Sequence, residues 1–145
     1  MKLSLIQRAI VAAIIMVASI AFAGTTTTRS NAASPASAAT IVLNNSFIGN
    51  SWRKQMEAEF TQVASAAQKQ GMIGSYSVVN GDNTVSQQIA ELDSLILKHV
   101  SAICLDAASE TALNGVIAKA HQAGILVVSF DGTVTSPYAV SYTHL

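Results

Sequence analysis

Residues Gly124 to Val140, GILVVSFDGTVTSPYAV, contain the clearest strand signal in the chain. The apolar run from Ile125 to Phe130 is interrupted only by Ser129, and it is followed directly by Asp131, Gly132 and several hydroxyl residues. A short apolar run that ends in turn residues is typical of a buried β-strand. The sequence therefore predicts that Asp131 lies at the carboxyl end of a strand.

The residues before this segment alternate between strand and helix patterns. Strands are predicted at 40–45 (TIVLNN), 75–80 (SYSVVN), 101–106 (SAICLD) and 125–130 (ILVVSF), with helices over 51–70, 85–99 and 108–124 between them. The apolar stripes of these helices are Trp52, Met56, Phe60, Val63 and Ala67; Val85, Ile89, Leu92 and Ile96; and Leu113, Val116, Ile117 and Ala120. Because a helix separates each pair of strands, the strands are most simply parallel and joined by right-handed crossovers. We predict an α/β fold, a doubly wound parallel sheet with helices on both faces.

Composition restricts the functions that this chain can have. Of its 145 residues, 50% are hydrophobic and 11% are charged, and the formal net charge is zero. Nucleic-acid binding by phosphate neutralisation therefore has no electrostatic basis. The single cysteine, Cys104, permits no intramolecular disulfide and is expected to be a buried, inert thiol.

The first part of the chain has the pattern of an export signal. Lys2 and Arg8 precede an apolar run of about 14 residues, and Ala21-Phe22-Ala23 matches a signal-peptidase site. The alternative is an uncleaved membrane anchor, although the run is shorter than the ~20 residues that span a bilayer. We predict a signal peptide at 1–23, a flexible linker at 24–39 and a periplasmic or secreted protein.

Polar and aromatic residues follow the predicted strands. In a doubly wound sheet, ligands bind beyond the carboxyl ends of the strands. Amides, carboxylates and hydroxyls hydrogen-bond to vicinal hydroxyl groups, and a flat aromatic ring covers the apolar face of a sugar. The segments concerned are 44–52, 80–83, 106–109 and 131–133. Such an edge suits a neutral polyol.

Patterns for other chemistry are missing from the sequence. It has no GxGxxG, GxxxxGK[ST] or G-x-S-x-G motif, and its three histidines and one cysteine have irregular spacing. His99 and His121 fall on predicted helices and not at strand ends. We predict no catalytic residues, no metal and no cofactor, and therefore a protein that is not an enzyme.

Three segments carry a resemblance to a known family. They are IVLNNSFIGNSWRKQM, QQIAELDSLILKHVSAICLDAAS and AHQAGILVVSFDGTVTSPYAV. Together they resemble the N-terminal lobe of a periplasmic sugar-binding protein, the ribose- or galactose-type solute receptor of ABC transporters. The resemblance covers residues 40–140 and implies a sugar ligand, a membrane permease as partner, no nucleic acid, and a monomer when full length. These receptors have two lobes, so the chain is interpreted as truncated, with 141–145 as a probable non-native tail.

The resemblance also implies which residues bind the ligand. By position, Asn45, Phe47 and Asp131 are the sugar contacts, and the longer first loop adds Asn50, Trp52 and Arg53. Each contact has a structural alternative. Asp131 and Asn45 could simply form turns, Trp52 could be buried on its helix stripe, and Asp82 and Asp106 are expected to cap the helices that follow them.

Three functions follow in order of preference. The first is capture of a sugar for an ABC importer, and the second is a sensing module that presents a bound small molecule to a membrane receptor or sensor kinase. The third, an exported enzyme, would need a nucleophile and a base at the strand ends, where the sequence places aspartates without a histidine.

Overall fold

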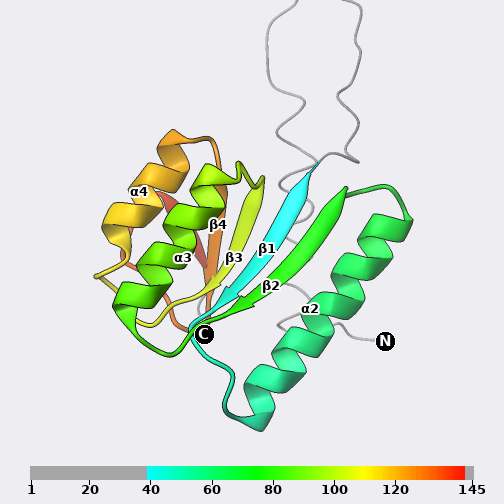
Figure 1. The fold of residues 1–145 in the computed structure, drawn as a ribbon, viewed down its shortest axis with the longest axis horizontal. Coiled ribbons are helices and arrows are strands. Elements are labelled where there is room, and N and C mark those ends of the chain that lie inside the picture. Colours follow the sequence, from blue (N-terminus) through cyan, green and yellow to red (C-terminus); the bar gives the residue numbers. More distant parts are fainter. Residues whose placement is uncertain (1–38, 143–145) are drawn as a thin grey trace, which may run out of the picture.

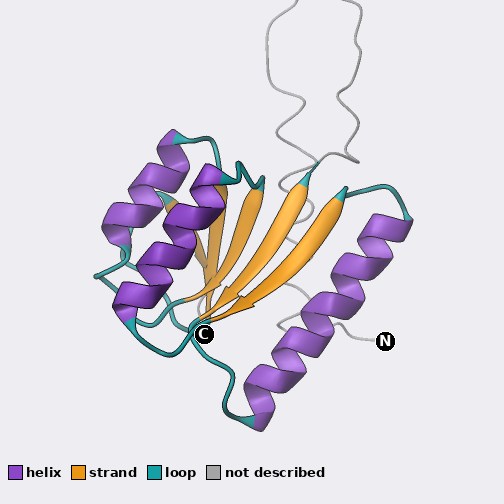
Figure 2. Ribbon diagram, in the orientation of Figure 1, coloured by secondary structure: helices purple, strands orange, loops and turns teal. Residues whose placement is uncertain are grey.

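The computed structural model describes residues 39–142, which form one parallel sheet flanked by helices (Figures 1 and 2). The predicted signal peptide and nearly all of the predicted linker lie outside the described residues. The elements are β1 (Thr40–Asn45), α2 (Ser51–Lys69), β2 (Ser75–Asn80), α3 (Val85–Leu97), β3 (Ala102–Asp106), α4 (Asn114–Gln122), β4 (Leu126–Phe130) and β5 (Ala139–Tyr142). All paired strands are parallel, in the order β2-β1-β3-β4-β5.

The strand order confirms the predicted doubly wound α/β fold. From β1 the chain passes through α2 to β2 on one side, and then through α3 to β3 on the other side of β1. α2 covers one face of the sheet, and α3 and α4 cover the opposite face (Figure 1). The loops after β1 and β3 therefore lead to opposite faces, and the topological switch point lies between these two strands.

The core consists of two layers because alternate strand residues point to opposite faces. On the α2 face, Leu43 and Cys104 pack with Met56 and Phe60. On the other face, β-strand residues pack against α3 and α4; the buried set includes Val42, Ile103, Leu105, Val127, Leu92, Leu95, Val116 and Ile117. Burial raises the pKa of the Cys104 thiol to about 12, which is consistent with an unreactive core cysteine.

A fifth strand extends the sheet beyond the four that the sequence predicted. β5 pairs with β4 from Val127↔Ala139 to Phe130↔Tyr142, and its last two residues lie beyond the predicted lobe boundary at Val140. β5 was not predicted from the sequence. The other strands were recognised because a helix pattern separates them, and no helix lies between β4 and β5. Residues 143–145 lie outside the described part of the chain.

Two helices differ in detail from their predicted stripes. α4 begins at Asn114, because residues 110–113 form turns in place of the predicted first helical turn. In α3 the fully buried positions are Gln88, Leu92 and Leu95, whereas Val85, Ile89 and Ile96 are only partly buried. The buried face of α3 is thus rotated from the predicted one toward Gln88. Gln88 can be buried because its amide forms hydrogen bonds inside the protein.

Candidate ligand-binding site

The last residues of three neighbouring strands form a polar row across the sheet. Asn80 ends β2, Asn45 ends β1 and Asp106 ends β3. The strand register places Asn45 opposite both Asn80 and Asp106. Residues in register on parallel strands point to the same face, and the side chains of Asn45 and Asn80 are joined by a hydrogen bond of 2.8 Å. Figure 2 shows the converging strand ends and the loops that leave them.

Arg53 binds this row from the first turn of α2. The helix begins after Asn50, whose side-chain oxygen caps it by accepting a hydrogen bond of 2.8 Å from the Arg53 backbone N–H. The guanidinium Nη1 donates to Asn45 Oδ1 and to Asp106 Oδ2, and Nη2 donates to Asp106 Oδ1 at 3.4 Å. Arg53 and Asp106 also form an ion pair. Helix capping therefore fixes the backbone of the residue that bridges β1 and β3.

Two aromatic rings flank the Arg53 guanidinium. Its central carbon lies 4.4 Å from the centroid of the Phe47 ring and 5.9 Å from that of the Trp52 ring. Contacts of this kind are attractive because the ring faces are electron-rich. Phe47 also forms an isolated β-bridge with Asp82. The loop after β1 is thus tied both to α2 and to the segment after β2.

Asn45 is buried, and both the nitrogen and the oxygen of its amide are hydrogen-bonded within the chain. Its Nδ2 donates to Phe47 O at 2.7 Å and to Asn80 Oδ1, and its Oδ1 accepts from Arg53. Asn80 in turn donates to Glu57 Oε2 at 3.0 Å. In this arrangement Asn45 shapes the first loop and orients the guanidinium.

Asp106 is the main residue of the site that the sequence interpretation missed. It was expected to cap a helix, but its side chain is completely buried and is bonded to Arg53. Burial raises the Asp106 pKa to about 6, although Arg53 lowers it; the nearby Asp131 carboxylate raises it further, and a backbone hydrogen bond from Gly132 lowers it. Asp106 and Asn45 are paired by the strand register, which sets the last residues of β1 and β3 opposite each other.

Asp131 follows β4 at the same edge, with its backbone in the left-handed region at φ 59°. The residue is exposed. Gly132 behind it is tightly packed, because an added Cβ would lie 2.5 Å from Ala107 O and 3.1 Å from Asp106 Oδ1. The close approach of Gly132 to the end of β3 therefore brings Asp131 close to Asp106.

A buried amide supports the row from the opposite face of the sheet. Gln88 of α3 donates to Asn44 Oδ1 at 2.9 Å and to the carbonyl of Asp106 at 3.0 Å, and it accepts from Ala108 N at 2.8 Å. Asn44 Nδ2 also donates to Glu91 Oε2 at 2.8 Å. These bonds hold the ends of β1 and β3 at a fixed separation. In the sequence, the only indication of this role is that Gln88 interrupts the apolar stripe predicted for the second helix.

The predicted contact residues have different positions in this arrangement. Asn45, Phe47, Trp52 and Arg53 lie together, and Asp131 is near them through its interaction with Asp106. The side-chain oxygen of Asn50 is engaged in capping α2. Trp52 is 37% exposed, so it is not buried under its helix.

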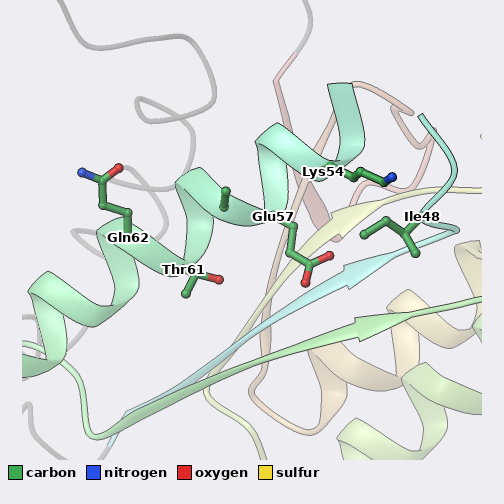
Figure 3. A pocket seen from close by; sticks show the side chains of 6 residues that line it. Ile48, Lys54, Glu57, Thr61 and Gln62 are labelled. Atoms are coloured by element: carbon green, nitrogen blue, oxygen red, sulfur yellow. The ribbon is translucent and has the colours of Figure 1, made fainter. Parts of the chain in front are cut away.

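A separate surface hollow lies beside this site along α2 (Figure 3). Ile48, Lys54 and Glu57 line it near the first loop, and its other lining residues are Ala58, Thr61 and Gln62. It is connected to the site through Glu57, which accepts the hydrogen bond from Asn80.

Within residues 39–142, no three or more His, Cys, Asp or Glu side chains are grouped so that they could hold a metal ion. In the same residues, no helix is long and apolar enough to cross a membrane.

Comparison with protein families identifies relatives of this chain. A family model described as a periplasmic binding protein domain matches residues 41–143. A solved ABC transporter solute-binding protein from Thermobispora bispora is 44% identical, with a TM-score of 0.68 over 71% of this chain and 33% of that protein. Comparison with curated proteins gave no match.

Two more distant structures share the fold. One is an ABC transporter solute-binding protein from Actinobacillus succinogenes with bound D-allose (23% identity, TM-score 0.55, 69% of this chain and 34% of that one). Another, from Clostridium phytofermentas, contains L-rhamnose (22% identity, TM-score 0.61, 70% and 30%). The chain thus spans about one third of the length of these proteins.

Proposed function

The chain belongs to the periplasmic binding protein family, and we propose that it forms the first lobe of an exported receptor that captures a sugar or similar small polyol for an ABC importer. The observation that carries this proposal is the preformed polar edge of Asn45, Arg53 and Asp106 beside the exposed Asp131 carboxylate. The receptor acts by binding and by closure of two lobes around the ligand, without chemistry on it.

The chemistry of the edge supports a polyol ligand. Asp131 offers two carboxylate oxygens, which accept hydrogen bonds from neighbouring hydroxyls. Trp52 and Phe47 present aromatic carbon that can cover the C–H face of a sugar. Structures with this fold have been solved with D-allose and with L-rhamnose bound, so the fold can accommodate such ligands.

Location and partners follow from the same proposal. The N-terminal export pattern supports a location in the periplasm or outside the cell, where the receptor would deliver its ligand to a membrane permease. The 44% identical relative is described as an ABC transporter solute-binding protein. In this proposal the full-length receptor is a monomer, and residues 40–140 belong to its N-terminal lobe.

A sensing role is the second candidate, because the same lobe can present a bound ligand to a membrane receptor or sensor kinase. The neighbouring genes discriminate between the two. A permease gene beside the full-length gene supports import, and a sensor-kinase gene without a permease gene supports sensing.

The ligand class is tested on the full-length receptor. Its melting temperature is measured with a panel of neutral pentoses and hexoses and with amino acids as controls, and hits are titrated by calorimetry. We expect at least one neutral sugar to bind with a Kd of about 1 μM or tighter, equivalent to roughly 8 kcal/mol. If an amino acid binds and no sugar does, the proposed function is wrong.

A further inference from the structure

We infer that this lobe selects for uncharged or amine-bearing polyols and against acidic sugars, because the one arginine of residues 39–142, Arg53, is already neutralised and a second carboxylate, that of Asp131, remains. This inference rests on the proposed function and specifies its substrate class. It concerns the charge of the ligand and not the identity of the sugar.

The first step concerns Arg53, the residue that would attract an acidic ligand. Both of its terminal nitrogens donate to Asp106, and one of them also donates to Asn45. The Arg53 side chain is only 12% exposed and that of Asp106 is 0% exposed. An acidic ligand could take Arg53 only by displacing Asp106, which would leave a buried carboxylate without its cation. The arginine charge is therefore not available to the ligand.

The second step concerns the remaining charge at the edge. Asp131 is exposed and forms no ion pair within residues 39–142. It already acts on Asp106 by raising its pKa, so the two carboxylates are close enough to repel. Arg53 is counted against Asp106, and Glu57, which accepts from Asn80, shares the α2 hollow with Lys54. Asp131 beside the row therefore remains as one net negative charge. A carboxylate on a ligand bound there would be repelled, whereas hydroxyl and ammonium groups would donate to Asp131.

The other cations of the described chain do not compensate this charge. Lys54 lines the α2 hollow together with Glu57 (Figure 3). Lys119 is paired with Asp93. Lys69 ends α2 and Lys98 follows α3, and in each crossover the helix runs from the strand ends back to the other edge of the sheet. No lysine of residues 39–142 therefore takes part in the row.

The N-termini of α2 and α3, the helices that follow β1 and β2, do not provide an open anion site. They point their partial positive charge toward the strand ends, which would favour an anion. In α2 the Asn50 side chain occupies a first-turn N–H, and in α3 Thr84 does the same. The segment before α3 also carries Asp82, whose carboxylate accepts from Thr84 and whose pKa is lowered by these bonds. The α3 terminus thus already has its own anion.

The experiment uses the full-length receptor and matched sugars. D-glucose and D-galactose are each compared by calorimetry with their uronic acids and 2-amino derivatives at neutral pH and low salt. We expect the uronic acid to bind at least about tenfold more weakly than the neutral sugar, and the amino sugar to bind no more weakly than the uronic acid. Higher salt should narrow the difference, because screening weakens the repulsion.

Two variants assign the discrimination to this lobe. Asp131→Asn removes the proposed charge with little change in shape, so the affinity ratio of neutral to acidic sugar should fall several-fold. Asp82→Asn removes one negative charge from the same edge of the sheet and should leave the ratio nearly unchanged. If the uronic acid and the neutral sugar bind equally well, or if the affinity ratio of neutral to acidic sugar is unchanged in Asp131→Asn, the inference is wrong but the proposed function is not affected. If neither these six sugars nor any neutral sugar of the wider panel binds, both the inference and the proposed function are contradicted.

Discussion

Arg53 and Asp106 form an ion pair that joins the first turn of α2 to the end of β3. The pair crosses β1, because Asn45 at the end of that strand accepts from the same guanidinium nitrogen. A site whose side chains are held before the ligand arrives loses less conformational entropy on binding. In the proposed function, this pair therefore holds the sheet edge ready for a ligand.

Removal of Arg53 tests how much the pair contributes to folding. Arg53→Met in the full-length protein leaves Asp106 buried without a cation and should lower the free energy of unfolding at pH 7.5 by about 3 kcal/mol. The loss should be smaller at pH 5, because Asp106 can then be protonated. Urea unfolding at both pH values provides the measurement.

The exposed pair Lys119–Asp93 provides a matched control. Its side chains are 63% and 42% exposed, and the atoms are 3.3 Å apart. Lys119→Met should cost less than about 1 kcal/mol, because exposed pairs contribute little. An equal loss of stability in the two variants would show that burial of the Arg53 pair has no special importance.

The Asp106 carboxyl should give the protein a characteristic pH dependence. Its folded pKa of about 6 is raised above the ordinary value of 3.8. A raised carboxyl pKa means that the folded state binds the proton more tightly, so this contribution is full below pH 4 and is lost as the pH rises through 6. The loss should be on the order of 2–3 kcal/mol. The difference between the stability profiles of wild type and Asp106→Asn isolates this contribution, and parallel profiles from pH 4 to 7 would contradict it.

The buried Gln88 amide should be important for stability, although its helix packs on the opposite face of the sheet from α2 and Arg53. Gln88→Leu leaves Asn44 Oδ1, the Asp106 carbonyl and Ala108 N without this partner. Unsatisfied buried groups of this kind cost about 1–3 kcal/mol each, so a total loss of several kcal/mol is expected. Its exposed neighbour Gln87 bonds only Glu91 through its side chain, and Gln87→Leu should be nearly neutral in thermal unfolding. A neutral Gln88→Leu would show that these three bonds do not support the strand ends.

Two glycines should respond in opposite directions to alanine. At Gly132 the new methyl group would meet the Ala107 carbonyl and should destabilise the protein by about 1–3 kcal/mol. At Gly115 of α4 a Cβ would meet nothing within 4 Å. Gly115→Ala should therefore stabilise by up to about 1 kcal/mol through helix propensity. An unchanged or raised melting temperature in Gly132→Ala would contradict the packing at Gly132.

The fold could be predicted from the sequence because its signal is local. Strands such as 75–80 and helices such as 51–70 differ in apolar period, and a helix between each strand pair indicates parallel pairing. β5 gave no such signal, because a loop without a helix connects it to β4. The segment 139–142 has too few residues to show a period.

The site could be predicted only in part, because its contacts depend on strand register. The family resemblance named Asn45 and Phe47, and the longer first loop added Arg53. The structure brings these three side chains together, and their contact with a ligand stays a prediction. Asp106 was assigned to helix capping, since nothing local indicates that it pairs with a residue 53 positions away. Gln88 was not assigned a role, because the hydrogen-bond partners of a polar residue on an apolar helix stripe cannot be identified until the fold is known.

Asp131 provides the most direct test of the proposed sugar site. Its exposed carboxylate should accept two hydrogen bonds from the ligand, each worth about 1.5–3 kcal/mol. Calorimetry on the full-length receptor should therefore show sugar binding weakened at least about tenfold in Asp131→Ala. The melting temperature should be nearly unchanged in Asp131→Asn, because asparagine tolerates the left-handed backbone at this position. Unchanged affinity in Asp131→Ala and Asp131→Asn, with a lower melting temperature, would show that Asp131 only shapes the turn after β4 and would contradict the proposed site.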